Sequence, residues 1–339
     1  MKAIGLYQYL PIENEQSLVD VEIDMHEPTG RDLLVAVRAL SVNPVDTKVR
    51  TSKATTESQP RILGWDAAGE VVAIGDDVAH YSVGDRVFYA GDITRPGSNS
   101  EYHLVDERIV GRAPEKLDYA EAAALPLTGI TAWEALFERL AVSPEGKDKG
   151  RSILIIGGAG GVGSIAIQLA NHVGKLNVIA TASRPESIAW VNKLGAKYVI
   201  NHHNALDGEL NAINISQVDY ILCLNNTDQH WKAMANVIAP QGRICSIVET
   251  SSPVDLGLLK SKSVAFVWEF MFSRSMFQTP DMIEQQRLLN AIASYIDQGN
   301  ITTTAKQKIR PINAANLRKA HAMLERGDTI GKIVLADWG

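Results

Sequence analysis

The pattern of apolar and polar residues along the chain changes near residue 152. Before that point, short apolar runs of strand length are separated by turns rich in Gly, Asp and Pro, which predicts a β-rich region. The predicted strands of this region cover residues 2–7, 33–42, 68–74, 85–90 and 100–105.

From residue 152 onward, short apolar strands alternate with segments of helical period. The predicted strands are 152–156, 177–181, 197–200, 218–224, 243–248 and 263–268. The predicted helices are 161–173, 185–194, 228–238 and 255–260. Strands separated in this way by helices indicate an α/β fold with a doubly wound parallel sheet. Beyond residue 275 the pattern predicts two helices and a final strand, at 281–298, 313–326 and 331–335.

The strand at 152–156 leads directly into Gly158-x-Gly160-x-x-Gly163. The segment that follows has one apolar face at helical spacing, made of Val162, Ile165, Ala166, Leu169, Ala170 and Val173. A glycine turn between strand and helix lets a pyrophosphate approach the helix N-terminus, where the N–H groups are unpaired. The unit therefore predicts a dinucleotide-binding site, and a tight turn that binds nothing is the alternative.

The bulk composition is that of a globular enzyme. A length of 339 residues suggests about two domains. The net charge of −6, with no dense run of Lys or Arg, argues against a nucleic-acid partner. We expect neither a membrane span nor a secretion signal, because the apolar runs are too short. Cys223 and Cys245 lie in apolar runs, which predicts buried, reduced thiols in neighbouring strands and a cytoplasmic location.

Several ordered motifs resemble the medium-chain dehydrogenase/reductase superfamily, and within it the quinone oxidoreductase branch of zinc-type alcohol dehydrogenase-like proteins. The motifs are SVNPVDTKVR (41–50), GWDAAGEVVAIGDDV (64–78), VGDRVF (83–88), ALPLTGITAWEAL (124–136), GGAGGVGS (157–164), LGAKYVIN (194–201) and the terminal GKIVL. The resemblance covers essentially the whole chain. It implies a GroES-like β-rich catalytic domain over 1–126, completed by 269–339, and a Rossmann dinucleotide-binding domain over 127–268.

The resemblance also raises the question of a metal, because the zinc-dependent relatives bind a catalytic zinc through Cys, His and Cys. Asn43, Trp65 and Ala124 stand at or near those three positions in this chain. None of these side chains replaces a thiolate or imidazole ligand. Asp46 and Asp66 lack ligand spacing, and two cysteines are too few for a four-cysteine structural zinc lobe. We therefore expect no bound metal.

The end of the second strand indicates which dinucleotide is bound. An acidic residue selects NAD there, but the position falls near Ala182 and is followed by Ser183 and Arg184. A hydroxyl and a guanidinium suit a 2′-phosphate, and the resemblance adds His202. The prediction is NADPH, with a solvated Ser-Arg pair before a helix as the alternative. We expect the adjacent His202 and His203 to point apart and to bind no metal.

By resemblance, Asn43 and Asp46 lie near the nicotinamide, and Thr128 lies near the nicotinamide ribose or phosphate. These three are the candidate catalytic residues. Asn43-Pro44 as a simple turn, and Thr128 as a simple helix cap, are the alternatives. Leu224, Asn225 and Val248 follow strands and are expected beside the cofactor. The predicted cofactor-binding residues are Asn43, Thr128, Gly158, Ala159, Gly160, Gly161, Val162, Gly163, Ser183, Arg184, His202, Leu224, Asn225 and Val248.

The segment 266–277 is dense in aromatic residues and Met, which suits a lid, a core or a subunit interface. By resemblance we expect a homodimer that uses the strand at 263–268. Glu269 and Arg274 are expected to form an ion pair.

Without a metal ion, the reduction of a simple ketone lacks oxyanion stabilisation. A conjugated acceptor needs less of it. The sequence therefore predicts an NADPH-dependent, zinc-independent reductase of a small, apolar, electron-poor quinone or α,β-unsaturated carbonyl. A zinc-dependent alcohol dehydrogenase and a non-catalytic NADPH-binding sensor or structural protein are the alternatives.

Overall fold

The computed structural model describes all 339 residues and divides the chain into two compact units. The first unit comprises Met1–Ile130 and Phe272–Gly339, and the second comprises Thr131–Met271. The boundaries expected from the sequence, after residues 126 and 268, fall a few residues earlier than those of the structure.

The first unit is built on two sheets. Its larger sheet has the order β15-β16-β3-β5-β6-β8, with β7 also paired to β3, and its smaller sheet has the order β2-β1-β4. The strands are β1 (Lys2–Gln8), β2 (Val19–Glu22), β3 (Asp32–Ser41), β4 (Thr56–Ile62), β5 (Ala67–Ile74), β6 (Arg86–Tyr89), β7 (Tyr102–Asp106), β8 (Val110–Arg112), β15 (Ala305–Ile309) and β16 (Lys332–Ala336).

Six of these strands confirm the predicted β-rich region and final strand, namely β1, β3, β5, β6, β7 and β16. The sequence did not predict β2, β4, β8 or β15. Strand β15 reads AKQKI, and its lysines and glutamine hide it from an apolar pattern. It pairs only with β16, in parallel, so it is an edge strand. Its charged side chains disfavour pairing of the open edge with another chain.

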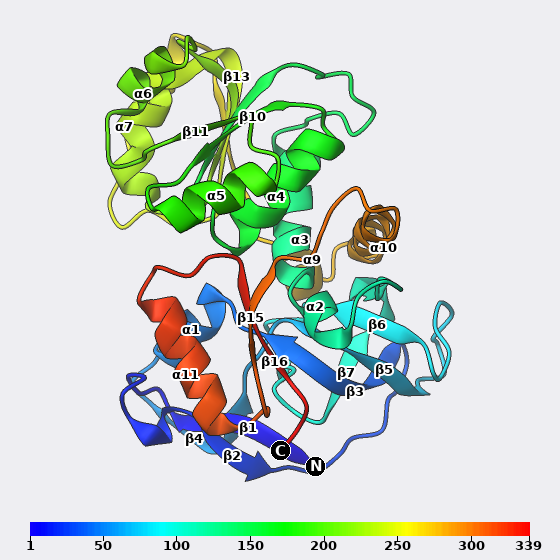
Figure 1. Cartoon of the computed structure of the whole chain (residues 1–339). Helices are drawn as coiled ribbons and strands as arrows, with labels where there is room; N and C mark the ends of the chain where they lie inside the picture. The colour runs from blue at the N-terminus through cyan, green and yellow to red at the C-terminus, as the bar shows by residue number, and fades with distance from the viewer. The chain divides into compact units, whose positions relative to one another are not determined.

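The helices of the first unit pack beside these sheets. They are α1 (Pro44–Arg50), α2 (Tyr119–Ala123), α3 (Pro126–Trp133), which continues into the second unit, α9 (Ser273–Phe277), α10 (Glu284–Asp297) and α11 (Ala314–Glu325). Figure 1 shows α11 lying beside α1, so the C-terminal part of the chain packs on its N-terminal part. The two chain ends also lie together, because the Lys2 ammonium donates to the main-chain oxygen of Gly339.

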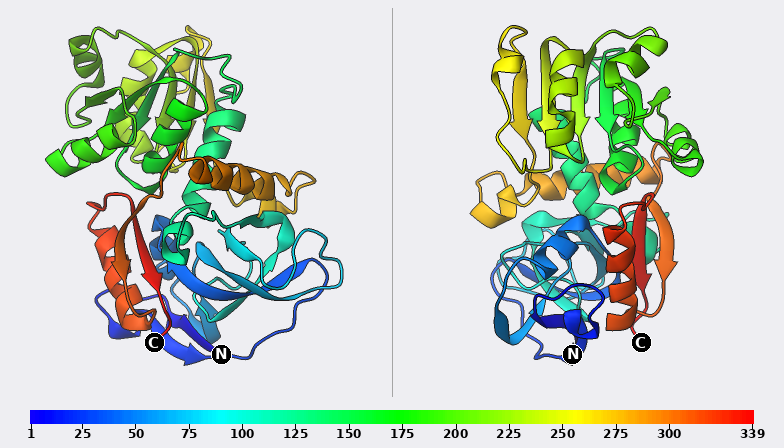
Figure 2. Two further views of the ribbon diagram at one scale, coloured as in Figure 1. Left: turned by 45° about the vertical axis from the view of Figure 1, so that its right-hand side comes forward. Right: turned by 90° about the vertical axis from the view of Figure 1, so that its left-hand side faces the viewer.

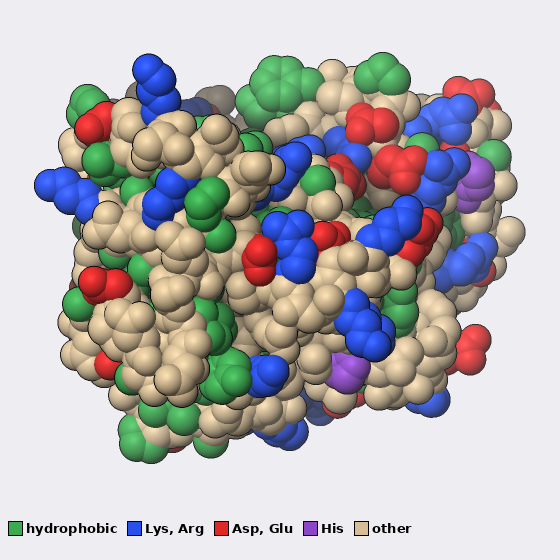
Figure 3. Space-filling model, turned by 90° about the horizontal axis from the view of Figure 1, so that it is seen from above, with side chains coloured by type: hydrophobic (Ala, Val, Ile, Leu, Met, Phe, Trp, Pro, Cys, Tyr) green, Lys and Arg blue, Asp and Glu red, His purple; other side chains and the backbone are tan.

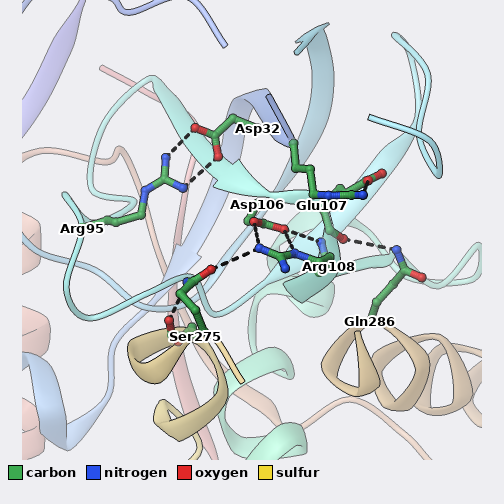
Figure 4. A network of polar contacts seen from close by, with 9 residues as sticks. Asp32, Arg95, Asp106, Glu107, Arg108, Ser275 and Gln286 are labelled. Atoms are coloured by element: carbon green, nitrogen blue, oxygen red, sulfur yellow. Dashed lines mark hydrogen bonds and ion pairs between the residues drawn. The ribbon is translucent and has the colours of Figure 1, made fainter. Parts of the chain in front are cut away.

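A polar network ties β3 and β7 to the C-terminal segment of the same unit (Figure 4). Arg95 donates to both carboxylate oxygens of Asp32 at 2.8 Å. The fully buried Glu107 accepts two main-chain N–H groups at 2.8 and 3.0 Å and one bond from Arg31. Gln286 of α10 donates to the main-chain oxygen of Glu107 at 3.2 Å. The C-terminal segment is therefore an integral part of the first unit.

The second unit contains one six-stranded parallel sheet, in the order β11-β10-β9-β12-β13-β14. The strands are β9 (Ser152–Ile156), β10 (Asn177–Thr181), β11 (Tyr198–Ile200), β12 (Val218–Cys223), β13 (Ile238–Ser246) and β14 (Ala265–Trp268). The helices are α4 (Gly161–His172), α5 (Pro185–Lys193), α6 (Leu206–Ala212), α7 (Thr227–Val237) and α8 (Gly257–Lys260). Helices α4 and α7 cover opposite faces of the sheet (Figures 1 and 2). The predicted doubly wound fold is confirmed.

The interior strands of this sheet are nearly continuous apolar runs, because helices bury both of their faces. Strand β9 reads SILII, and its last four residues are completely buried. Cys223 and Cys245 lie buried on the neighbouring strands β12 and β13 as free thiols, as expected from their apolar surroundings. No helix anywhere in the chain is both long enough and apolar enough to cross a membrane.

Candidate functional site

The predicted glycine turn follows β9 and leads into α4, whose N-cap is Gly160. The first turn of α4 leaves main-chain N–H groups unpaired, as the first turn of any helix does. Ala159, Gly160, Gly161 and Val162 are all partly exposed, whereas the strand before them is buried. An anion can therefore reach the N-terminus of a helix twelve residues long.

The three glycines of the motif are required for different reasons. A side chain at Gly163 would bring a Cβ within 2.5 Å of the Gly157 oxygen, so close packing of helix and strand needs a glycine. A Cβ at Gly158 would lie 2.9 Å from the Cβ of Ala180, which is tight as well. A Cβ at Gly160 would meet only the Gly157 oxygen, at 3.7 Å. Protein packing therefore does not explain Gly160, and the turn leaves room there for a ligand to approach closely.

Residues that the sequence did not indicate fix the shape of this turn. The main-chain N–H groups of Gly157 and Gly158 donate to the hydroxyl and main-chain oxygens of Thr181 at 2.9 and 3.2 Å. Trp190 donates to Ser164 at 2.8 Å, and Ser164 donates to the Gly160 oxygen at 2.7 Å. Only pairing between β9 and β10 brings Thr181 to the turn, so no local motif could have shown it.

The predicted 2′-phosphate residues lie at the ends of two adjacent strands. The main-chain N–H of Ala182 donates to the Ile200 oxygen at 3.0 Å, which joins the carboxyl ends of β10 and β11. Ser183 and Arg184 follow β10, and His202 follows β11. The three residues therefore lie together at the carboxyl-terminal ends of these parallel strands. Arg184 is exposed and is the N-cap of α5.

The expectation that His202 and His203 point apart is wrong. Their ring centroids lie 4.3 Å apart, because the turn after β11 brings both rings to the same side. Burial and the neighbouring His203 lower the pKa of His202. Its Nδ1 is buried and has no hydrogen-bond partner, which leaves one ring position for a ligand group.

Leu224 and Asn225 lie against the glycine turn. A Cβ built at Gly157 would be 3.4 Å from the Cβ of Leu224 and 3.5 Å from Oδ1 of Asn225. This Oδ1 is buried and has no partner within the protein. The main-chain oxygen of Val248 accepts a hydrogen bond from the Thr227 hydroxyl at 2.6 Å, which fixes the loop after β13. These residues lie at the carboxyl ends of strands, where such sheets bind ligands.

The first unit contains a buried polar cluster around Asn43, which we call the Asn43 cluster. It comprises Asn43, Asp46, Asp66 and Lys332, all at most 3% exposed. The Lys332 ammonium donates to the main-chain oxygen of Val42 at 2.7 Å, to Asp66 at 3.0 Å and to Oδ1 of Asn43. The sequence singled out Asn43 and Asp46 and missed the link to Lys332, which is 289 residues away from Asn43.

Hydrogen bonds within this cluster occupy most of its polar atoms. The amide nitrogen of Asn43 donates to Asp66 at 2.8 Å and to the main-chain oxygen of Trp65 at 3.4 Å. Asp66 also accepts the main-chain N–H of Leu127 at 2.8 Å, which joins the start of α3 to the cluster. Both amide hydrogens of Asn43 therefore point to protein acceptors, and its contribution in this structure is to position its neighbours.

Asp46 is the least satisfied member of the cluster. Its Oδ2 accepts the main-chain N–H of Asn43 at 2.6 Å, as the third residue of a helix does in a cap, and its Oδ1 has no partner. Burial raises the pKa of Asp46 to about 7, and the nearby Lys332 opposes the shift. Burial also raises the pKa of Asp66, against the same opposing charge.

Thr128, the third candidate catalytic residue, is 2% exposed and lies in the first turn of α3. Its hydroxyl donates to the main-chain oxygens of Leu125 and Ala124 at 3.3 and 3.4 Å, which are long hydrogen bonds. Bonds of this length are weak and leave the hydroxyl able to turn toward a ligand.

The side chains that by resemblance stand at the zinc-ligand positions lack a thiolate or imidazole and are deeply buried. Asn43, Trp65 and Ala124 are each at most 1% exposed. The carboxylate of Asp66, next to Trp65, is already engaged by an ammonium, an amide and a main-chain N–H. No group of three or more His, Cys, Asp or Glu side chains anywhere in the chain is arranged to hold a metal ion.

The second unit contains a pair of buried carboxyl groups, of which sequence reasoning named Glu269 but missed Glu134. Glu134 lies in a short π-helix (Glu134–Arg139) and Glu269 lies just after β14, and both are at most 3% exposed. Arg139 donates to Glu269 at 2.9 Å and lies 3.7 Å from Glu134. Burial and the nearby Glu134 raise the pKa of Glu269, because one arginine cannot offset two buried carboxylates.

The expected ion pair between Glu269 and Arg274 is wrong. Glu269 pairs with Arg139, and Arg274 pairs with Asp281 at 2.9 Å. The two residues are close in sequence, but the chain passes from one compact unit to the other between them. Glu269 and Arg274 therefore each pair with a residue of their own unit.

Replacing Glu269 with Gln should flatten the dependence of stability on pH. The raised pKa means that the folded state holds a proton that the unfolded state has lost, so stability falls as pH rises above the ordinary value for Glu. One proton contributes about 1.4 kcal/mol per pH unit at most. We expect the free energy of unfolding, measured in urea at pH 6 and pH 8, to fall less in Glu269→Gln than in the native protein. The exposed Glu186→Gln on α5 is the control, and equal slopes for all three proteins would contradict the prediction.

Comparison with known proteins agrees with this architecture. The alcohol dehydrogenase GroES-like domain matches residues 29–115, and the zinc-binding dehydrogenase family matches residues 194–335. A zinc-type alcohol dehydrogenase-like protein from Staphylococcus epidermidis is 44% identical over 99% of both chains.

Solved structures extend the likeness to the whole chain. A putative zinc-dependent alcohol dehydrogenase from Rhizobium etli is 51% identical with a TM-score of 0.96, covering 100% of this chain and 98% of that one. The Escherichia coli quinone oxidoreductase, solved with NADPH, is 26% identical with a TM-score of 0.84, covering 99% and 100%. This chain therefore belongs to the medium-chain dehydrogenase/reductase superfamily of oxidoreductases, with zinc-type alcohol dehydrogenase-like and quinone oxidoreductase relatives.

Proposed function

We propose that this protein is a zinc-independent, NADPH-dependent reductase of quinones or α,β-unsaturated carbonyl compounds. The observation that carries the proposal is the buried Asn43 cluster, which contains Asn43, one of the residues that by resemblance take the zinc-ligand positions. Its ammonium, that of Lys332, lies 3.0 Å from Asp66, and a zinc ion at this place would be repelled by that charge. Asn43 and Trp65 offer neither thiolate nor imidazole.

A conjugated acceptor suits such a site better than a simple ketone. Without a Lewis acid, the negative charge that develops on a simple carbonyl oxygen has little to stabilise it. In a quinone or enone the added electron pair spreads over a conjugated system, and hydrogen-bond donors in a dry site stabilise the remaining charge. When bound, the nicotinamide supplies the hydride, and the protein supplies orientation and polarisation.

The second unit has the features of a dinucleotide site. Gly160 leaves room that the protein does not fill, and Oδ1 of Asn225 is a buried acceptor without a partner beside the turn. Ser183, Arg184 and His202 offer a hydroxyl, a guanidinium and an imidazole to a 2′-phosphate, and the second strand ends without an acidic residue. The quinone oxidoreductase solved with NADPH is a structural relative. We infer that NADPH is preferred over NADH.

We further propose a homodimer formed through β14. This strand pairs only with β13, so its outer edge is open. Trp268 and Phe270, at its end, are 47% and 48% exposed, and a second copy would cover them. Analytical ultracentrifugation measures the assembly directly.

Two further features bear on partners and location. Acidic and basic side chains are interspersed on the face shown in Figure 3, which offers no basic stripe to a nucleic acid. Buried free thiols suit a cytoplasmic protein.

Steady-state oxidation of NADPH tests the proposed reaction. We expect turnover with simple quinones or enones in the presence of a chelator. Elemental analysis should find far less than one zinc ion per chain. One zinc per chain together with chelator-sensitive alcohol oxidation would replace the proposal with a zinc-dependent dehydrogenase. Tight binding of NADPH without turnover on any acceptor would indicate a sensor.

Replacing Gly160 with Ala should weaken binding of the dinucleotide without unfolding the protein. The new methyl group meets no protein atom closer than 3.7 Å, so we expect only the modest loss of stability, about 1 kcal/mol or less, of an alanine at a helix N-cap. The methyl would occupy the path of the pyrophosphate, and a loss of about tenfold in affinity corresponds to 1.4 kcal/mol. Calorimetric titration measures the affinity. Gly208→Ala on α6, whose added methyl meets no atom within 4 Å, is the control. Equal affinity in all three proteins would argue against a phosphate at the Gly160 turn.

Replacing Arg184 with Ala should reduce the preference for NADPH over NADH. A charge-assisted bond from the guanidinium to a 2′-phosphate contributes about 1.5–3 kcal/mol, so the dissociation constant for NADPH should rise about 10- to 100-fold. The constant for NADH should stay the same, because NADH lacks this phosphate. The exposed Arg287→Ala on α10 makes the same charge change as a control. An unaltered ratio of the two constants in Arg184→Ala would remove Arg184 from the phosphate site.

A further inference from the structure

Two buried polar atoms beside Asn43 have no partner in the protein. They are Oδ1 of Asp46 and Nε1 of Trp65, and each residue is 1% exposed. Both residues are bound to Asn43, whose main-chain N–H donates to Asp46 and whose amide donates to the main-chain oxygen of Trp65. Leaving such an atom unpaired costs about 1–3 kcal/mol, so two around one residue need an explanation.

The charges of the Asn43 cluster place a proton on Asp46. The cluster contains one ammonium, that of Lys332, and two carboxyl groups, those of Asp46 and Asp66, so it is neutral only when one carboxyl is protonated. Asp66 accepts three hydrogen bonds, whereas Asp46 accepts one. The proton therefore belongs on Asp46, at its unpartnered Oδ1.

Other charged groups near Asp46 do not change this assignment. Lys48 is exposed on the same helix. Arg50, one turn further along α1, is engaged by the main-chain oxygen of Leu10 and by Glu325. The pKa of Asp46, raised to about 7 by burial, agrees with a carboxyl group that holds its proton up to neutral pH.

A protonated Oδ1 and an indole N–H are both hydrogen-bond donors, and a carbonyl oxygen accepts two hydrogen bonds. We propose that Asp46 and Trp65 bind the carbonyl oxygen of the electron acceptor, and that Asp46 supplies the proton of the reduction. The proposal rests on the reductase function proposed above and names the groups that take the place of a Lewis acid. It gives Asp46 a catalytic role and Trp65 the role of an oxyanion donor.

The step balances in atoms and electrons. The electrophilic carbon of the acceptor receives a hydride, that is, two electrons and one hydrogen, from the reduced nicotinamide. The carbon–carbon π pair of the conjugated system shifts to form a new π bond to the carbonyl carbon, and the carbonyl π pair moves onto the oxygen. The Oδ1–H bond of Asp46 breaks, and the proton forms an O–H bond with that oxygen. The Asp46 carboxylate then regains a proton from solvent, so each turnover consumes one NADPH and one proton.

Trp65 can be tested without disturbing its packing. Its ring lies edge-on to Phe272 at 6.1 Å, and Phe retains an aromatic ring there while losing the N–H. Removal of one oxyanion donor costs about 100- to 1,000-fold in kcat, so Trp65→Phe should lower kcat within that range and leave the NADPH dissociation constant unchanged. Trp231→Phe is the matched control, because its indole N–H already has an acceptor, the main-chain oxygen of Asp255.

Asp46→Asn keeps an oxygen for the main-chain N–H of Asn43 but cannot transfer a proton. In the native protein kcat should fall as pH rises through neutrality, because the required form of Asp46 is the protonated one. In Asp46→Asn kcat should be low and should lack this fall. The exposed Asp76→Asn is the control.

Two further measurements need no turnover. Difference infrared spectroscopy at pH 6 should show the carbonyl stretch of a protonated carboxyl group that is missing in Asp46→Asn. The free energy of unfolding of the native protein should fall between pH 5 and pH 7, since only the unfolded state releases this proton there, and the slope should be smaller in Asp46→Asn.

The outcomes separate the two proposals. If the native protein reduces acceptors and Asp46→Asn and Trp65→Phe match its kcat and pH profile, this inference is wrong and the reductase function stands. If the native protein binds NADPH but reduces no quinone or enone, both proposals fail. A missing infrared band in the native protein would by itself place the proton elsewhere and overturn the role of Asp46.

Discussion

The buried ion pair between Lys332 and Asp66 is the interaction on which the first unit's site depends. Through it, the last strand of the chain binds the segment at 42–46 and the start of α3. A buried pair of this kind gains little over apolar packing, but loss of one partner costs about 3–5 kcal/mol, because the other charge stays buried. Its value therefore lies in fixing one arrangement of Asn43 and Asp66 rather than in added stability.

The proposed sites of the two units are built in different ways. In the second unit the proposed site lies at the ends of parallel strands, where helix N-termini and unpaired main-chain groups are produced by the fold itself. In the first unit no such general feature exists, and the site is made from side chains that come from distant segments. The first kind of site tolerates changes in most side chains around it, whereas the second depends on each of its members.

This difference also explains which features could be predicted from the sequence. The alternation of apolar strands and helices, and the glycine turn, are local patterns, and they predicted the parallel sheet and its strand–turn–helix unit correctly. Asn43 and Asp46 were singled out only through a resemblance to a family. Lys332, Thr181 and Glu134 act on residues far away along the chain, so no periodicity or motif could indicate them. Strand β15 was not predicted for another reason. It is an edge strand whose side chains are mostly polar, so it lacks the apolar pattern of a strand.

The order of the segments along the chain has a consequence for synthesis on the ribosome. The second unit is one continuous stretch, Thr131–Met271, and its sheet can form as soon as that stretch has emerged. The first unit lacks β15, β16 and Lys332 until the final residues are translated. Throughout that interval Asp66 has no cation to pair with, so the nascent N-terminal segment must remain hydrated around it. The dinucleotide fold is therefore complete before the unit that carries the Asn43 cluster can close.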